Sequence, residues 1–167
     1  AGNGYGSSLF YVLTYVLTTL GTFGLIMVLS RPGFESEQIA DLSGLNKRSP
    51  VLAGAMAVFM FSLAGIPPTV GFYAKLAVLQ ALITTNSPLL LQISIAAVLL
   101  SLVGAFYYLR IVKVMYFDEP TDTTPVAQAG GARVLLSVNA LAVLALGILP
   151  SGLMTLCAKA ITQSLAG

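Results

Sequence analysis

The chain has 167 residues, of which 57% are hydrophobic and 8% are charged, and its mean hydropathy is +0.91. A soluble domain usually has about 25% charged residues, so this composition excludes an ordinary soluble domain and predicts an integral membrane protein. The net charge of +2 without a basic cluster argues against a nucleic-acid partner. With no histidine and one cysteine, the usual catalytic bases, metal sites and an internal disulfide are excluded, so proton chemistry must use lysine, carboxylates, hydroxyls and water.

The first apolar stretch, residues 8–29, is long enough to cross a membrane, which takes about 20 residues. Nothing before it resembles a signal peptide, and the missing initial Met indicates a piece of a longer protein. Hydroxyl side chains recur at intervals of three and four and form one stripe: Tyr11, Thr14, Tyr15, Thr18 and Thr22. The stripe fits a surface that meets hydrated neighbours, although ordinary packing of membrane helices is the commoner explanation.

A second apolar segment, residues 50–85, is too long for one straight crossing, because a continuous helix would extend about 54 Å. Its middle reads SLAGIPPTVGFYAK, and Gly65, Pro67, Pro68 and Gly71 are predicted to interrupt the helix there. Two arrangements are open: a hairpin of two short spans, or one crossing made of two half-helices.

The distribution of basic residues favours the single broken crossing. In that arrangement the basic residues between the spans lie on one side of the membrane, which the positive-inside rule makes the cytoplasmic side. These residues are Arg31, Lys47, Arg48, Arg110, Lys113 and Arg133.

Lys75 follows the break by one helical turn and is placed near the membrane midplane, about 15 Å from the end of the segment. A charge at that depth costs about 2.5–3.5 kcal/mol on insertion scales, so its surroundings must compensate. Broken membrane helices often hold ion sites, and we therefore predict that Lys75 exchanges protons in a water-filled passage. Ser62, Thr69 and Tyr73 are candidate neighbours. The alternative is a permanently charged, structural lysine that binds the free carbonyl groups of the break.

Two further spans are predicted, at residues 88–117 and 133–149, and residues 153–165 are expected to form an interfacial helix. Arg110 and Lys113, at the end of the third span, either mark the exit of a proton path or anchor the helix at the membrane surface. The sequence thus predicts an all-α, polytopic transmembrane bundle of about four crossings, with residues 1–167 forming a single membrane domain.

Three blocks of the sequence resemble the antiporter-like membrane subunits of respiratory complex I. They are SLAGIPPTVGFYAKLAVLQA (62–81), FYYLRIVKVMYFDEP (106–120) and VNALAVLALGILP (138–150). The last two blocks favour the bacterial subunit N branch of this family. So does Leu76, because related subunits have an acidic residue after the lysine or a glutamate in its place. The resemblance covers the C-terminal third of that branch, with its last four crossings.

The resemblance implies a proton-translocating membrane subunit of NADH-quinone oxidoreductase, in which Lys75 belongs to a central proton relay. The family's other relay residues lie in a preceding repeat that this chain lacks. It also implies that NADH, FMN, iron–sulfur clusters and quinone are bound by other subunits and that this chain binds no cofactor. The expected partners are other membrane subunits of complex I, the lipid bilayer, protons and water, and the expected location is the bacterial inner membrane. Two alternatives remain: a subunit of a multi-subunit sodium/proton antiporter, and a structural membrane subunit.

Overall fold

A computed structural model describes residues 2–30, 38–120, 126 and 130–166 of the chain. Every regular element in these ranges is a helix, which confirms the predicted all-α class. The elements are α1 (Gly2–Leu29), the short 3-10 helix η1 (Ile39–Leu42), α2 (Leu45–Arg48), α3 (Pro50–Ala64), α4 (Val70–Ile83), α5 (Pro88–Phe117), α6 (Gly130–Ile148) and α7 (Pro150–Ala166).

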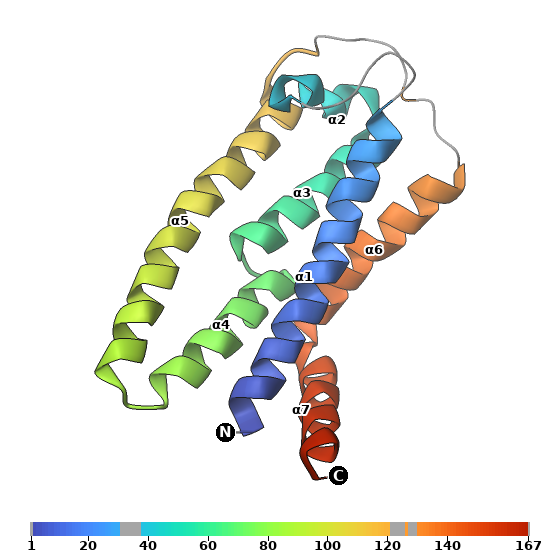
Figure 1. The fold of residues 1–167 in the computed structure, drawn as a ribbon. Helices are drawn as coiled ribbons and strands as arrows, with labels where there is room; N and C mark the ends of the chain where they lie inside the picture. Colours follow the sequence, from blue (N-terminus) through green and yellow to red (C-terminus); the bar gives the residue numbers. More distant parts are fainter. Residues whose placement is uncertain (1, 31–37, 121–125, 127–129, 167) are drawn as a thin grey trace.

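The helices form an elongated bundle around α1 (Figure 1). α1 packs against α3, α4, α6 and α7, whereas α5 packs against α3 and α4. The side chains that fill the bundle are mostly large and apolar, because each of these helices must bury one face: they include Phe10, Leu25, Phe59, Met60 and Val143.

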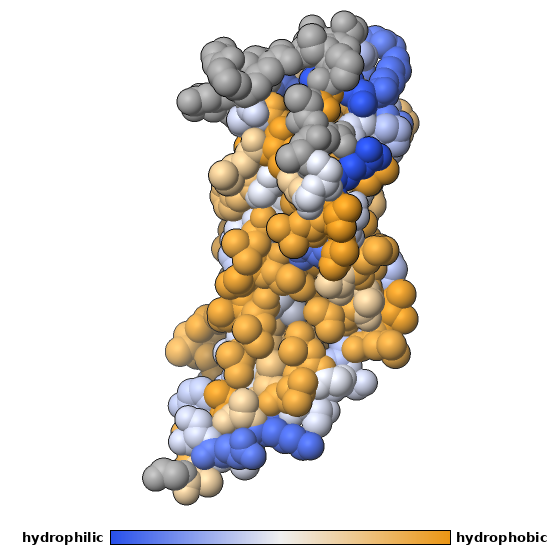
Figure 2. All heavy atoms as spheres, turned by 90° about the vertical axis from the view of Figure 1, so that its right-hand side faces the viewer, coloured by the Kyte–Doolittle hydropathy of each residue, from blue (hydrophilic) through white to orange (hydrophobic). Residues whose placement is uncertain are grey.

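The surface of the bundle is also strongly apolar, as expected for a protein whose solvent is lipid. Three described helices are long and apolar enough to cross a membrane: Gly4–Leu29, Pro88–Phe117 and Gly130–Ile148. In Figure 2 a broad hydrophobic band lies between more hydrophilic ends of the molecule. A soluble protein would bury this band, so the prediction of a multi-pass membrane protein is supported by its surface as well as by its composition.

The first helix begins earlier than the span predicted at residues 8–29. α1 starts at Gly2, and its first turns pack against α7 at the end of the chain. A Cβ atom on Gly6 would lie 3.3 Å from the Cα atom of Ala158, so the two backbones are close together there. This tertiary contact stabilises a glycine-rich turn that helix propensity alone disfavours.

The second apolar segment forms two half-helices of similar length. α3 has 15 residues and α4 has 14, and in Figure 1 they follow one another from one end of the bundle to the other. Each covers about 21–22 Å at 1.5 Å per residue, so the break between them lies halfway along the bundle. Both are shorter than the three long apolar helices, and neither folds back on the other as a hairpin would.

Lys47 and Arg48 of α2 lie at the end of the bundle where α3 begins. The N–H of Gly44, just before α2, donates to the carbonyl oxygen of Val114 near the end of α5 at 3.2 Å. At the same end Lys47 forms an ion pair with Glu119 at 2.7 Å. Arg31, also predicted to lie on this side, is outside the described residues.

The last helix is longer than the segment predicted at residues 153–165. Its first residue is Pro150, a position where the missing N–H costs no hydrogen bond, and the preceding helix α6 ends at Ile148. α7 packs along the N-terminal part of α1, and Cys157 is buried in the core there. Whether α7 lies at a membrane interface stays a prediction.

Candidate functional site

The end of α3 leaves two carbonyl groups that the break itself does not satisfy. Gly65 has the left-handed backbone conformation, with φ 81° and ψ 42°, which ends the helix. Its N–H donates to the carbonyl oxygens of Phe61 and Ser62 at 2.9 and 3.1 Å. Because the last four carbonyl groups of a helix have no partner inside it, those of Leu63 and Ala64 need partners from elsewhere.

The side chain of Lys75 reaches back from α4 and supplies these partners. Its Nζ atom donates to the carbonyl oxygen of Leu63 at 2.8 Å and to that of Ala64 at 3.1 Å. A third acceptor comes from α5, where the hydroxyl oxygen of Ser101 lies 2.8 Å from Nζ. The C-terminal end of a helix also carries partial negative charge, which favours a cation. Lys75 is therefore the C-terminal cap of α3, although it belongs to the next helix.

Two glycines allow the half-helices to approach closely enough for this contact. A Cβ atom on Gly65 would lie 3.2 Å from Nζ of Lys75, so a side chain there would crowd the amine. A Cβ atom on Gly71 would overlap the carbonyl oxygen of Ser62. Gly71 was predicted as part of the interruption, but α4 begins at Val70, so this glycine is helical. Its missing side chain serves the close packing of α4 on α3.

The link between the half-helices packs against α6. It contains the cis peptide bond between Pro67 and Pro68, followed by Thr69, which is buried and donates its hydroxyl to the carbonyl oxygen of Ile66 at 2.7 Å. A Cβ atom on Gly147 of α6 would overlap the carbonyl oxygen of Pro68. Sequence reasoning missed Gly147, because a glycine within a helix does not reveal which neighbouring segment packs against it.

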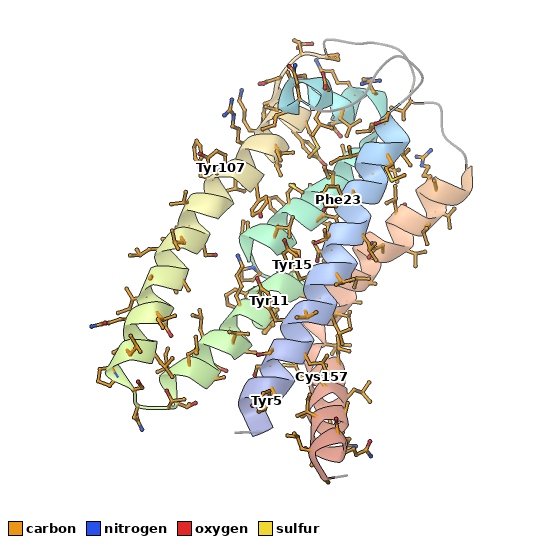
Figure 3. All side chains as sticks on the ribbon, viewed as in Figure 1. Tyr5, Tyr11, Tyr15, Phe23, Tyr107 and Cys157 are labelled. Atoms are coloured by element: carbon orange, nitrogen blue, oxygen red, sulfur yellow. The ribbon has the colours of Figure 1, made fainter. Side chains whose placement is uncertain are left out.

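Lys75 opens onto a groove of about 710 Å³ between α1, the break, α4 and α5. Tyr11 and Tyr15, labelled in Figure 3, line it from α1 and Tyr108 lines it from α5. The other hydroxyl groups of the lining are those of Thr14, Thr18, Ser62 and Ser101. In the described part of the chain, no carboxylate lines this groove, and Lys75 is its one positively charged side chain. The polar groups around Lys75 are therefore hydroxyl and carbonyl oxygens.

The three candidate neighbours of Lys75 lie close to the break, but none of them has a hydrogen bond to its amine in the described ranges. The Ser62 hydroxyl accepts from the N–H of Gly71 at 3.2 Å and lies 3.2 Å from the Thr18 hydroxyl. The Thr69 hydroxyl donates to the carbonyl oxygen of Ile66 within the link, as described above. Tyr73 packs its ring edge-on against Phe72, with 5.2 Å between the ring centroids. The direct hydroxyl partner is Ser101, which sequence reasoning missed.

Arg110 and Lys113 lie apart from the break, near the end of α5. Both are exposed, and Lys113 pairs with Asp118 just beyond the helix. Ser101 precedes Arg110 by nine residues on the same helix, so about 13 Å along the axis separates them. The structure does not bring these two charges to Lys75, and their assignment to a proton path stays a prediction.

Within the described ranges, no group of three or more histidine, cysteine, aspartate or glutamate residues is placed to hold a metal ion.

Comparison with known proteins identifies the family of the chain. The family described as "NADH:quinone oxidoreductase/Mrp antiporter, TM" matches residues 1–101, which include the break and Lys75. The chain belongs to this family. The match includes the first of the three sequence blocks, and the relatives below cover the other two, so the resemblance is confirmed.

Individual relatives can be aligned with nearly the whole chain. NADH-quinone oxidoreductase subunit N of Thiobacillus denitrificans is 62% identical over 162 residues, which cover 97% of this chain and 33% of the relative. Subunit N of Herminiimonas arsenicoxydans is 58% identical over 164 residues, which cover 98% of this chain and 33% of the relative. The chain thus spans about a third of the length of the curated relatives it matches.

Two solved structures share the fold. Respiratory complex I from Thermus thermophilus with bound aureothin has a chain that is 28% identical, with a TM-score of 0.77 over 90% of this chain and 34% of that one. The Mrp complex from Dietzia sp. DQ12-45-1b has a chain that is 22% identical, with a TM-score of 0.80 over 96% of this chain and 38% of that one. At that identity the second similarity concerns the fold alone.

Proposed function

We propose that the chain is part of subunit N of a bacterial respiratory complex I, a proton-translocating NADH-quinone oxidoreductase. In this function α3 and α4 together form one broken membrane crossing among about four, and Lys75 at the break takes up and releases protons. The complex transfers electrons from NADH to quinone, and this chain contributes to the proton pumping that accompanies the transfer.

The observation that carries the proposal is the position of the Lys75 amine. Halfway along the bundle, it is bound to oxygens alone and opens onto a groove lined by hydroxyl groups. Irregular backbone at membrane depth is stable only where protein or water satisfies its polar groups, and such breaks are common at ion sites in transporters. The high identity to subunit N relatives in the same region supports this assignment.

The proposal assigns no redox cofactor to this chain. NADH, FMN, the iron–sulfur clusters and quinone are bound by other subunits in this function. The direct partners are the other membrane subunits of the complex, lipid, water and protons. The bacterial inner membrane is the location, with the end of the bundle that carries Lys47 and Arg110 on the cytoplasmic side.

Replacing Lys75 by Met in the intact complex tests the proposal. Proton translocation and NADH-driven quinone reduction are measured together in sealed vesicles. We expect the number of protons moved per electron to fall, because methionine cannot carry a proton. Lys159→Met is the matched control: it makes the same change at an exposed position of α7, far from the groove. An unchanged ratio in Lys75→Met, with the complex assembled, would refute the relay.

A second candidate function is that of a subunit of a multi-subunit sodium/proton antiporter. The family model favours it, because its description names the Mrp antiporter beside NADH:quinone oxidoreductase. Vesicles that contain the complete protein distinguish the two functions. Proton movement driven by a sodium gradient without NADH supports the antiporter, whereas movement that requires NADH and quinone supports complex I.

The third function, a structural membrane subunit, is favoured by one observation: Lys75 caps α3. If that cap were its whole purpose, Lys75→Met would reduce assembly of the complex and leave the proton-to-electron ratio of the assembled fraction unchanged. The same experiment therefore separates this function from the proposed one.

A further inference from the structure

The amine of Lys75 has as many oxygen partners as an ammonium group has protons. An ammonium donates three hydrogen bonds and accepts none. Its three partners here are the carbonyl oxygens of Leu63 and Ala64 and the hydroxyl oxygen of Ser101. The two carbonyl groups can only accept, whereas a hydroxyl can accept or donate. Ser101 is therefore the one partner of the three that can reverse the direction of its hydrogen bond.

The same arrangement also suits the neutral amine. A neutral amine has two N–H donors and one lone pair. The two N–H groups satisfy the two carbonyl groups of α3, and the lone pair accepts the hydrogen bond from the Ser101 hydroxyl. The cap of α3 is thus complete in both protonation states, and only the bond to Ser101 changes direction.

Within the described helices, the hydroxyl of Ser101 is not bonded to a carbonyl group of its own helix, unlike several other hydroxyl groups of the bundle. Ser94, Ser137 and Thr14 each donate to the carbonyl oxygen four residues earlier in their own helix. In the described part of the chain Ser101 has no such bond, and its one hydrogen-bond partner is Lys75. Because Ser101 also lines the groove, its proton is available to water there.

We infer that Ser101 is the group through which Lys75 exchanges its proton with water in the groove. This inference rests on the proposed function of Lys75 as a relay, and it names the atom next to the amine on the path.

The transfer balances without any further reactant. As Nζ of Lys75 gives a proton to Oγ of Ser101, Oγ gives its own hydroxyl proton to a water molecule in the groove. The products are a neutral amine, an unchanged serine hydroxyl and a protonated water, and reloading follows the same steps in reverse. No charge remains on the serine oxygen at either stage, so a hydroxyl that never ionises on its own suffices.

The titratable groups that share the groove do not compete for this role. Tyr11 and Tyr15 reach it from α1 and Tyr108 from α5, and none of them is hydrogen-bonded to Lys75 in the described residues. α4 and the end of α3 contribute no other titratable side chain to the lining. Ser101 is therefore the hydroxyl group of this lining that is in direct hydrogen-bond contact with the amine.

Substitution of Ser101 in the complete complex tests this inference. Ser101→Ala removes the hydroxyl, and Ser101→Thr keeps it. The readout is the initial rate of NADH-driven proton translocation, normalised to quinone reduction in the same vesicles. We expect the normalised rate to fall about tenfold in Ser101→Ala, the factor associated with loss of one hydrogen bond to a charged group, and to recover in Ser101→Thr.

The matched control is Ser94→Ala, seven residues earlier on the same helix and buried, with its hydroxyl bonded inside α5. It is expected to translocate protons normally. If Ser101→Ala does not assemble, Ser101→Cys replaces it, because a thiol keeps the size of the side chain but is a weak hydrogen-bonding group.

The outcomes for Lys75 and Ser101 separate the two proposals. Normal translocation in Lys75→Met refutes the relay function itself. Impaired translocation in Lys75→Met with normal translocation in Ser101→Ala leaves the relay in place and overturns the role of Ser101. Equal impairment in Ser101→Ala and Ser101→Thr also overturns it, because the hydroxyl would then not be the feature that matters. Recovery in Ser101→Thr, with Ser94→Ala normal, supports it.

Discussion

The Nζ atom of Lys75 lies 2.8 Å from the carbonyl oxygen of Leu63, twelve residues earlier and on the other side of a helix break. The side chain of Lys75 therefore has two roles to consider. The amine completes the end of α3, and in the proposed function it also takes up and releases protons. Experiments on this residue must therefore distinguish loss of the cap from loss of proton transfer.

Lys75→Arg separates the two roles. The guanidinium group keeps a positive charge and several N–H donors for the carbonyl groups of α3, but it stays protonated under all physiological conditions. We expect the complex to assemble and proton translocation to be largely lost. Assembly is followed by native gel electrophoresis and translocation by a pH-sensitive dye in vesicles. Translocation at the unaltered rate in Lys75→Arg would show that deprotonation at this position is not required.

Gly71→Ala is expected to destabilise the junction of the half-helices. The added methyl group would overlap the carbonyl oxygen of Ser62, which is backbone and cannot move aside without shifting α3. Overpacking of this kind costs about 1–3 kcal/mol. The half-life of the purified complex at elevated temperature measures the effect.

The control for Gly71 is Gly54→Ala on α3, where a Cβ atom meets nothing within 4 Å. Alanine there is expected to leave stability unchanged or raise it by about 0.5–1 kcal/mol, because glycine is unfavourable inside a helix. Equal half-lives for Gly71→Ala and Gly54→Ala would contradict the close approach of α4 to α3.

Gly147→Ala is expected to disturb the same region from the other side. A Cβ atom there would overlap the carbonyl oxygen of Pro68 in the link, so α6 would have to move away from the break. We expect a shorter thermal half-life and, because the link positions the start of α4, a lower translocation rate. Gly152→Ala, at an open position of α7, provides the comparison. Full stability in Gly147→Ala would mean that α6 does not press against the link.

Lys47→Ala is expected to have little effect, in contrast to these substitutions. Its ion pair with Glu119 is well formed at 2.7 Å, but the two side chains are 55% and 85% exposed. Exposed pairs contribute about 0–1 kcal/mol, and salt weakens them further. Thermal half-lives at low and high salt measure the contribution. A large loss of stability that persists at high salt would show that Lys47 has a further structural role.

Much of the fold could be predicted because lipid imposes simple constraints on sequence. A crossing needs about 20 apolar residues, so residues 8–29 and 88–117 stand out by length alone. The break stands out because glycine and proline interrupt a helix, and Lys75 because a charge in an apolar segment needs compensation. Each of these signals is local, and each can be read without knowing which helices are neighbours.

The contacts that complete the site could not be predicted, because they join distant parts of the chain. Ser101 lies 26 residues after Lys75, and no spacing rule indicates which face of α5 meets the break. Gly147 belongs to a helix that passes the link only in the folded bundle. The early start of α1 likewise depends on its contact with α7, and the sequence does not indicate that these two helices are neighbours. The sequence thus located the amine and, in one of its two alternatives, the free carbonyl groups of the break, but not the hydroxyl partner on α5.

The carbonyl group of Leu63 is also a natural spectroscopic reporter. Hydrogen bonds from a charged donor are shorter and stronger than those from a neutral one, so the stretching frequency of this carbonyl depends on whether Lys75 holds its extra proton. An isotope label at that single carbon would move its infrared band away from the other amides. During turnover, the band would then record the loading of one amine inside a complex of many subunits.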